Sequence, residues 1–170
     1  PPEWNLAFLP TDEPLGQEYI TWMKAAVEFG RHNRRVMLGR ACHALEFWAG
    51  KALGIDEIQI VESVEAVHNY AAIEHHGGEN LWVHRKGAIL ARKGTKGIIP
   101  GAMGRASYIV EGLGNPESFH TASHGAGRRL GRRQALATLT EEQVKQALQG
   151  FVLVKPTGLA DVAEECADAY

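Results

Sequence analysis

The chain has 170 residues, of which 22% are charged, and its formal net charge is −2. This length favours one domain with one sizeable core, and the composition shows no sign of disorder. No apolar run approaches the roughly 20 residues that a membrane-spanning helix needs. The opening Pro-Pro-Glu-Trp has neither the basic nor the apolar region of a signal peptide. Cys42 and Cys166 are too few for a disulfide framework, so we expect a reducing, cytoplasmic setting.

Positive charge is concentrated in the middle of the chain. Residues 85–133 contain ten Lys or Arg but only two acidic residues, Glu111 and Glu117, although the whole chain is slightly acidic. A basic segment in an acidic protein suggests a local site for a polyanion. The alternative is that these charges are scattered over a solvated surface.

The first third of the chain is predicted to form one long helix over residues 16–53. Apolar residues recur there at helical spacing, and strong helix formers are common. Thr11 or Asp12 is expected to cap its beginning, with Pro14 tolerated in the first turn. Gly54 is expected to end it.

The centre of the chain is predicted to be rich in strands and loops. Residues 58–64 are rich in β-branched side chains and predict a strand that runs into residues 67–76. Gly77 and Gly78 then predict a turn before the apolar residues 81–83. Further short strands are expected among the glycines that follow, at residues 98–99 and 107–110.

Two short helices are predicted after this centre. A basic helix is expected up to about Leu139, and Thr140 with Gln143 forms a capping box for a second helix that ends near Gly150. Residues 151–154 look like a strand. The expected fold is therefore mixed α/β, with a β-rich centre flanked by helices.

The stretch around His124 has the strongest chemical character. The small residues Gly125, Ala126 and Gly127 follow the imidazole, so the backbone can approach a bulky ligand and turn its N–H groups toward an anion. Arginines, which can grip phosphate oxygens in pairs, come next, at Arg128, Arg129, Arg132 and Arg133. A neutral imidazole beside a bound phosphate is a candidate nucleophile. The alternative is a Gly-rich turn into a basic, solvated helix.

Six of the eight histidines fall between His68 and His124. Histidine is a common metal ligand, but the spacings match no HExxH or paired CxxC motif, and there is no Walker loop. His68 follows a predicted strand and precedes Asn69, which suits a ligand at a strand end. The histidines expected to be only surface or packing residues are His32, His43, His75 and His76.

Several motifs, taken in order, resemble those of the RtcB RNA ligases. The matching pieces are His68-Asn69-Tyr70-Ala71 with Glu74 and His76, Val83-His84-Arg85-Lys86-Gly87-Ala88, Pro100-Gly101-Ala102-Met103-Gly104, Ser107-Tyr108, Ser118-Phe119 and Ser123-His124-Gly125-Ala126-Gly127-Arg128. Leu6-Ala7-Phe8-Leu9-Pro10 and the final Glu164-Glu165 to Ala169-Tyr170 also look like that family. The resemblance covers essentially the whole chain.

This resemblance implies a GTP- and manganese-dependent ligase that joins RNA 3′-phosphate or 2′,3′-cyclic phosphate ends to 5′-hydroxyl ends. By the family pattern His124 becomes guanylylated, His68 is a Mn²⁺ ligand, and Asn69 touches the nucleotide. The remaining positions that match GTP/GMP-binding residues are Pro100, Gly101, Ala102, Met103, Ser107, Gly125, Ala126, Gly127 and Tyr170. Candidates for holding RNA phosphates are Arg85, Lys86, Arg128 and Arg132. Some members use a small activating protein, archease, which makes it a candidate partner; no membrane is implied.

The chain also departs from the family pattern. The family is more than twice as long, and its other metal ligands, a Cys and two His, lie in motifs that would precede residue 1; Cys42 does not match that Cys. A nucleotide-binding Lys would follow Tyr170. Smaller departures are Ala102 and Gly131, where Ser is common. We therefore expect residues 1–170 to be a single partial domain, the C-terminal-half core of an RtcB-like ligase, truncated at both ends and inactive as an RNA ligase on its own.

Two other functions stay open at this point. One is a naturally shortened relative that binds RNA or a nucleotide without catalysis. The other is a single-metal phosphate hydrolase that uses His68 and His124.

Overall fold

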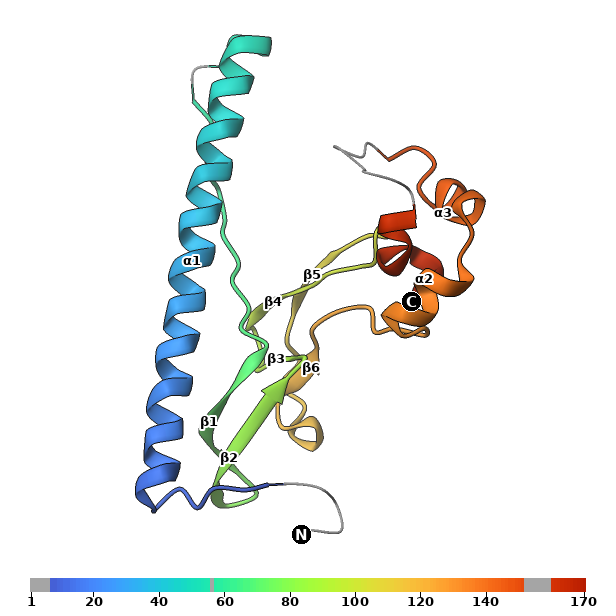
Figure 1. The fold of residues 1–170 in the computed structure, drawn as a ribbon. Coiled ribbons are helices and arrows are strands. Elements are labelled where there is room, and N and C mark those ends of the chain that lie inside the picture. Colours follow the sequence, from blue (N-terminus) through green and yellow to red (C-terminus); the bar gives the residue numbers. More distant parts are fainter. Residues whose placement is uncertain (1–6, 56, 152–159) are drawn as a thin grey trace. The chain divides into compact units, whose positions relative to one another are not determined.

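The computed structural model describes residues 7–55, 57–151 and 160–170. The chain divides into two compact units, Pro1–Ser63 and Val64–Tyr170 (Figure 1). The first unit contains one long helix, and the second contains paired strands followed by short helices. The fold is mixed α/β, as predicted. In the described part of the chain, no helix is long and apolar enough to cross a membrane.

The long helix α1 spans Pro14–Leu53, close to its predicted bounds. Pro14 occupies the first turn, where its missing N–H costs no hydrogen bond. Gly54 ends the helix in the left-handed conformation with φ 67°, as expected. The N-cap is Glu13, without a side-chain cap, so the prediction that Thr11 or Asp12 caps the helix is wrong.

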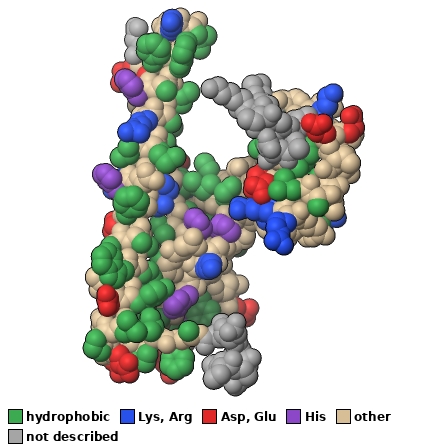
Figure 2. Space-filling model, viewed as in Figure 1, with side chains coloured by type: hydrophobic (Ala, Val, Ile, Leu, Met, Phe, Trp, Pro, Cys, Tyr) green, Lys and Arg blue, Asp and Glu red, His purple; other side chains and the backbone are tan. Residues whose placement is uncertain are grey.

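Apolar side chains on α1 are largely exposed. Trp22 and Phe29 are 69% and 73% exposed, and Figure 2 shows hydrophobic side chains along the helix. Only Gly16 and Ile20 are buried among the helical residues. The helix therefore depends on its good helix formers and its C-terminal glycine more than on packing.

The strand predicted over residues 58–64 is absent, and the prediction is wrong. The backbone from residue 57 to residue 68 forms no regular structure, and Val61 is 89% exposed. β-branched residues favour an extended backbone, but a strand also needs a neighbouring strand to receive its hydrogen bonds. No described strand pairs with this segment.

The described residues of the second unit form three antiparallel strand pairs. They are β1 (Asn69–His76) with β2 (Glu79–Lys86), β3 (Ala88–Leu90) with β6 (Thr121–Ser123), and β4 (Lys96–Ile99) with β5 (Tyr108–Glu111). The predicted turn between β1 and β2 is confirmed at Gly77 and Gly78, whose φ values are 61° and 90°. Glycine adopts these positive φ values without steric cost.

Short helices pack together at the C-terminal end of the second unit. They are α2 (Arg132–Thr138), α3 (Glu141–Ala147), η3 (Ala160–Glu165) and η4 (Ala167–Ala169). A further short helix, η2 (Pro116–Ser118), lies between β5 and β6. The predicted capping box of Thr140 and Gln143 is present at the start of α3. Phe151 lies outside any strand, and the rest of the strand predicted over residues 151–154 lies outside the described residues.

A small apolar cluster forms the core of this C-terminal part. It consists of Val144, Leu148, Ala163 and Cys166, with Met103 packed against it. Met103 and Cys166 also form an isolated β-bridge, and the Met103 N–H donates to the carbonyl of Glu165 at 2.9 Å. The core therefore anchors the loop that begins at Pro100.

Replacing Leu148 tests this core. Leu148 is 5% exposed, so Leu148→Ala should lower the free energy of unfolding by about 3 kcal/mol through lost burial and a residual cavity. Leu136→Ala is the matched control, because Leu136 is 49% exposed, and it should cost less than about 0.5 kcal/mol. Urea denaturation measures both, and equal losses would contradict this assignment of the core.

Candidate functional site

The rings of His68 and His124 lie face to face. His68 immediately precedes β1 and His124 immediately follows β6, so two strand ends carry them to one place. Their centroids are 5.0 Å apart and the ring planes differ by 9°. The predicted metal ligand and the predicted nucleophile, 56 positions apart in the chain, are thus brought together.

The backbone of Gly87 lies against the His124 ring. It links β2 to β3 with φ 69°, and a Cβ atom there would lie 3.2 Å from the His124 Cε1 atom. The Gly87 N–H donates to the His68 carbonyl at 2.8 Å and to Asn69 Oδ1 at 3.3 Å. The backbone at Gly87 therefore joins His68, Asn69 and His124 into one group.

The segment that carries His124 is short and depends on its neighbours. Strand β6 has three residues, and Ser123 pairs with Ala88 of β3. The Ala91 N–H extends this pairing by donating to the carbonyl of His120 at 2.6 Å. Before β6, Phe119 and His120 both adopt the left-handed conformation, with φ 52° and 50°. Such values are uncommon for residues other than glycine.

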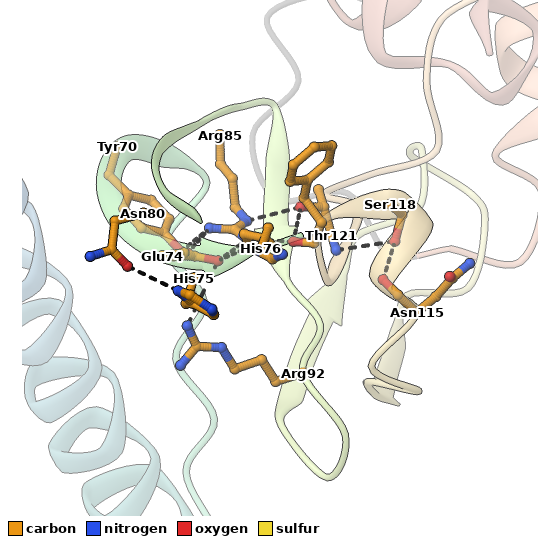
Figure 3. A network of polar contacts seen from close by, with 11 residues as sticks. Tyr70, Glu74, His75, His76, Asn80, Arg85, Arg92, Asn115, Ser118 and Thr121 are labelled. Carbon is orange, nitrogen blue, oxygen red and sulfur yellow. Dashed lines mark hydrogen bonds and ion pairs between the residues drawn. The ribbon is translucent and has the colours of Figure 1, made fainter. Parts of the chain in front are cut away.

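A buried ion pair holds this turn against the β1–β2 hairpin (Figure 3). The guanidinium of Arg85 donates to both carboxylate oxygens of Glu74, at 2.5 and 3.0 Å. It also donates to the Tyr70 hydroxyl at 3.1 Å, the Thr121 hydroxyl at 3.1 Å and the Phe119 carbonyl at 2.8 Å. All five N–H donors of Arg85 are thereby used.

The pair sets the ionisation of both partners. The hydrogen bond from Arg85 lowers the pKa of the Glu74 carboxyl to about 2, against the opposing effect of burial, and His76 adds to the lowering. Burial lowers the pKa of Arg85, but the hydrogen bonds and charge interactions with Glu74 and Tyr70 together outweigh this, and the pKa is raised overall. Both groups are therefore charged at neutral pH. Arg92, 3.7 Å from the same carboxylate, is 54% exposed.

The loop with Pro100 at its start approaches the loop after His124. A Cβ atom on Gly125 would lie 3.7 Å from the carbonyl oxygen of Pro100. Within the first loop, the Gly101 N–H donates to Ser107 Oγ at 3.2 Å, and Gly101 lies so close to Ala106 that no side chain fits between them. In the second loop, the Gly125 N–H donates to Ser123 Oγ at 3.3 Å.

A second polar group surrounds Tyr170. The Arg128 guanidinium lies 4.7 Å from the centroid of the Tyr170 ring and donates to its hydroxyl at 3.0 Å. That hydroxyl donates to Glu165 at 2.6 Å, and this hydrogen bond raises the pKa of Tyr170. Arg128 also pairs with Glu165 at 3.3 Å, and Arg132 lies 3.8 Å from both Glu164 and Glu165.

The described residues do not complete a metal centre. Among them, no three His, Cys, Asp or Glu side chains are grouped so that they could hold an ion. His68 would supply one ligand, and a stable site would need others. The predicted Mn²⁺ site therefore stays a prediction.

Comparison with known proteins identifies the family. The model of the family described as tRNA-splicing ligase RtcB matches residues 1–170. The chain belongs to the RtcB family. It is 38% identical over 169 residues to the RNA-splicing ligase RtcB of Escherichia coli K12, covering 99% of this chain and 41% of that protein.

More distant RtcB proteins match over the same extent. The RNA-splicing ligase RtcB of Mycobacterium tuberculosis is 35% identical, covering 99% of this chain and 42% of that protein. The tRNA-splicing ligase RtcB of Aeropyrum pernix is 31% identical, covering 100% of this chain and 39% of that protein. The chain thus spans about two fifths of the length of these relatives.

One residue predicted from the RtcB pattern changes its role. Arg85 was expected to hold an RNA phosphate, but it is 1% exposed and all its donors are engaged inside the protein. That prediction is wrong, because an RNA phosphate would have to displace a buried carboxylate. Lys86, the next residue on β2, is exposed and stays a candidate.

Sequence reasoning also missed the partners of Arg85. Tyr70, Glu74 and His76 alternate along β1 and so share one face, and Arg85 pairs directly with Tyr70 in the register. Opposite charges on the same face of a predicted hairpin were therefore a usable signal. No local pattern, however, indicated that the turn before β6 would reach this face.

The Glu74 carboxylate makes the stability of this RtcB chain depend on pH. Its folded pKa of about 2 lies below the ordinary value of 4.5, so its contribution is complete above pH 4.5 and is lost as the pH falls toward 2. The loss should be on the order of 3 kcal/mol. Urea denaturation between pH 6 and pH 2 measures it.

Glu74→Gln is the comparison for this titration. The variant should be less stable near neutral pH, by about 3 kcal/mol or more, because it leaves Arg85 buried and unpaired. It should also show a smaller loss between pH 4.5 and pH 2 than the parent. If the parent and Glu74→Gln lost the same stability between pH 4.5 and pH 2, the titration could not be assigned to Glu74.

Gly87 offers a test of the ring contact. Gly87→Ala and Gly77→Ala each place a side chain at positive φ, at 69° and 61°, and each should cost about 1 kcal/mol. Only the Ala at position 87 would meet the His124 ring, since a Cβ at Gly77 has nothing within 4 Å. We therefore expect the His124 ring resonances in ¹H–¹³C spectra to move in Gly87→Ala alone. If the His124 ring resonances were the same in Gly87→Ala and Gly77→Ala, the contact between Gly87 and the His124 ring would be contradicted.

Proposed function

We propose that this chain carries the guanylylation centre of an RNA ligase, with His124 as the nucleophile. The observation that supports this most strongly is the stacking of His124 on His68, the two residues that the resemblance to RtcB proteins predicts as nucleophile and metal ligand. His124 is exposed and follows a three-residue strand. An incoming nucleotide can therefore reach its ring.

The proposed first step is attack by a ring nitrogen of neutral His124 on the α-phosphorus of GTP. A P–N bond forms, the bond to the β-phosphate oxygen breaks, and pyrophosphate leaves; the ring loses its proton to solvent. The guanylate is then passed to the RNA 3′-phosphate, which breaks the P–N bond and restores His124. Attack by the RNA 5′-hydroxyl on the activated 3′-phosphate closes the phosphodiester and releases GMP.

The residues around His124 suit the substrates of these steps. The backbone of Gly125, Ala126 and Gly127 can lie close to the nucleotide, and the loop that starts at Pro100 approaches it. Lys86, at the end of β2 beside Gly87, can face an RNA phosphate, and phosphate contacts of this kind make binding salt-dependent. The aromatic ring of Tyr170 can stack on the guanine. Contacts with Arg128 and Glu165 already hold this side chain in place.

Bound Mn²⁺ would stabilise the negative charge that develops on the reacting phosphates. Among the described residues, no three His, Cys, Asp or Glu side chains lie close enough together to hold a metal ion. Ligands from outside these residues would therefore have to complete the Mn²⁺ site. A second candidate function is a nucleotide- or RNA-binding module without catalysis. The partners proposed for the ligase are RNA with 3′-phosphate or cyclic phosphate and 5′-hydroxyl ends, and archease.

Intact-mass spectrometry after incubation with GTP and Mn²⁺ separates the two candidates. We expect a guanylate adduct on the parent protein, none on His124→Ala, and an adduct on His43→Ala. His43 is the matched control, because it is an exposed histidine on α1.

An adduct that survives in His124→Ala would contradict the proposed nucleophile. A complete lack of adduct on the parent, with GTP binding retained, would favour the binding module. Release of phosphate from RNA ends without GTP, lost in His124→Ala, would instead indicate the phosphate hydrolase.

A further inference from the structure

The turn at Phe119 and His120 has an uncommon backbone conformation that contacts from β1 and β2 help to hold in place. Both residues have positive φ, at 52° and 50°, and neither is glycine. A conformation of this kind persists only when surrounding contacts over-determine it. Only the three residues of β6 separate this turn from His124, so the shape of the turn decides how the chain enters β6.

Arg85 adds contacts from β2 to the local hydrogen bonds of this turn, in which the N–H groups of Phe119 and His120 donate to the carbonyls of Pro116 and Asn115. Its Nη2 donates to the Phe119 carbonyl at 2.8 Å, and its Nε donates to Thr121 Oγ1 at 3.1 Å. The Thr121 hydroxyl donates in turn to the Phe119 carbonyl at 3.1 Å. From β1, the His76 ring packs against the rings of Phe119 and His120, with centroids 4.9 and 5.1 Å apart.

The turn then sets the pairing of β6 with β3. Three residues pair, and Thr121 lies opposite Leu90. A strand this short resists slippage poorly, and a shift of one residue moves every side chain to the other face. His124 follows directly, so a slip would carry its ring away from His68 and Gly87.

We propose that Arg85 is a positioning residue for the chemistry at His124, acting through the Phe119 carbonyl and Thr121. This inference rests on the proposed function for its chemical consequence, while the geometric part stands on the contacts alone. Arginine suits the role because its planar fork grips Glu74 with one edge and the turn with the other. Lysine has three donors on a single nitrogen and cannot span both.

Two substitutions test the role, and a third serves as control. Arg85→Lys keeps the positive charge and removes the fork. Thr121→Val removes one contact from the turn and leaves the Arg85–Glu74 pair intact, so it decides the question if Arg85→Lys does not fold. Arg92→Lys is the control, because Arg92 reaches the same carboxylate from an exposed position and has no hydrogen bond to the turn.

Amide hydrogen exchange provides a readout that needs no activity. The Ala91 N–H, bonded to the His120 carbonyl, reports on the turn. The Gly112 N–H, bonded to the Thr95 carbonyl next to β4 and β5, reports on the rest of the sheet structure. We expect exchange at Ala91 to be about tenfold faster in both test variants, with Gly112 unchanged. Arg92→Lys should match the parent at both amides.

The rate of guanylate adduct formation gives the second readout. It should fall about 100-fold in Arg85→Lys, with little change in the GTP concentration that gives half the maximal rate. Unchanged exchange at Ala91, equal acceleration at Ala91 and Gly112, or a parental rate of adduct formation in Arg85→Lys would each overturn the proposal. If the parent itself forms no adduct, the proposed function fails, and the exchange rates still decide whether Arg85 holds the turn.

Discussion

The site depends on one buried ion pair, between Arg85 and Glu74. Glu74 lies on β1, Arg85 on β2, and the turn that Arg85 grips leads into β6. Removing two charges from water is costly, so such a pair adds less stability than its short distances suggest. Its value here is geometric. Three of the five Arg85 hydrogen bonds fix the guanidinium on Tyr70 and Glu74, and the other two hold the turn that leads to His124, whose ring stacks on His68.

The surroundings of His124 combine a rigid support with an open approach. The ring of His124 lies against Gly87, where a side chain would press on it, and the small residues that follow His124 leave space for a nucleotide. A nucleophile gains most when it is held near its attack geometry before the substrate binds. The strain at Phe119 and His120 fits this account, since strained backbones gather at sites whose geometry matters.

Sequence reasoning predicted the local features and missed the long-range ones. The ends of α1 and the capping box of α3 depend on Pro14, Gly54, Thr140 and Gln143, which act on neighbours in the chain. The strand predicted over residues 58–64 failed because pairing depends on a distant partner. The role of Arg85 was mistaken for a related reason. An arginine in a basic segment suggests phosphate binding, and only the fold shows that all its donors are used. Their acceptors belong to Tyr70, Glu74, Thr121 and Phe119. The resemblance to RtcB proteins correctly indicated the family, which the match over residues 1–170 establishes.

The most direct test of this account is the distance between the His68 and His124 rings in solution. In a chain with ¹³C-labelled histidine, nuclear Overhauser contacts between the two rings can be measured without substrate, metal or turnover. The account predicts a cross-peak between them in the parent protein, as expected for centroids 5.0 Å apart, and its loss in Arg85→Lys. A folded parent without that cross-peak would contradict the claim that the ion pair presents His124 to His68.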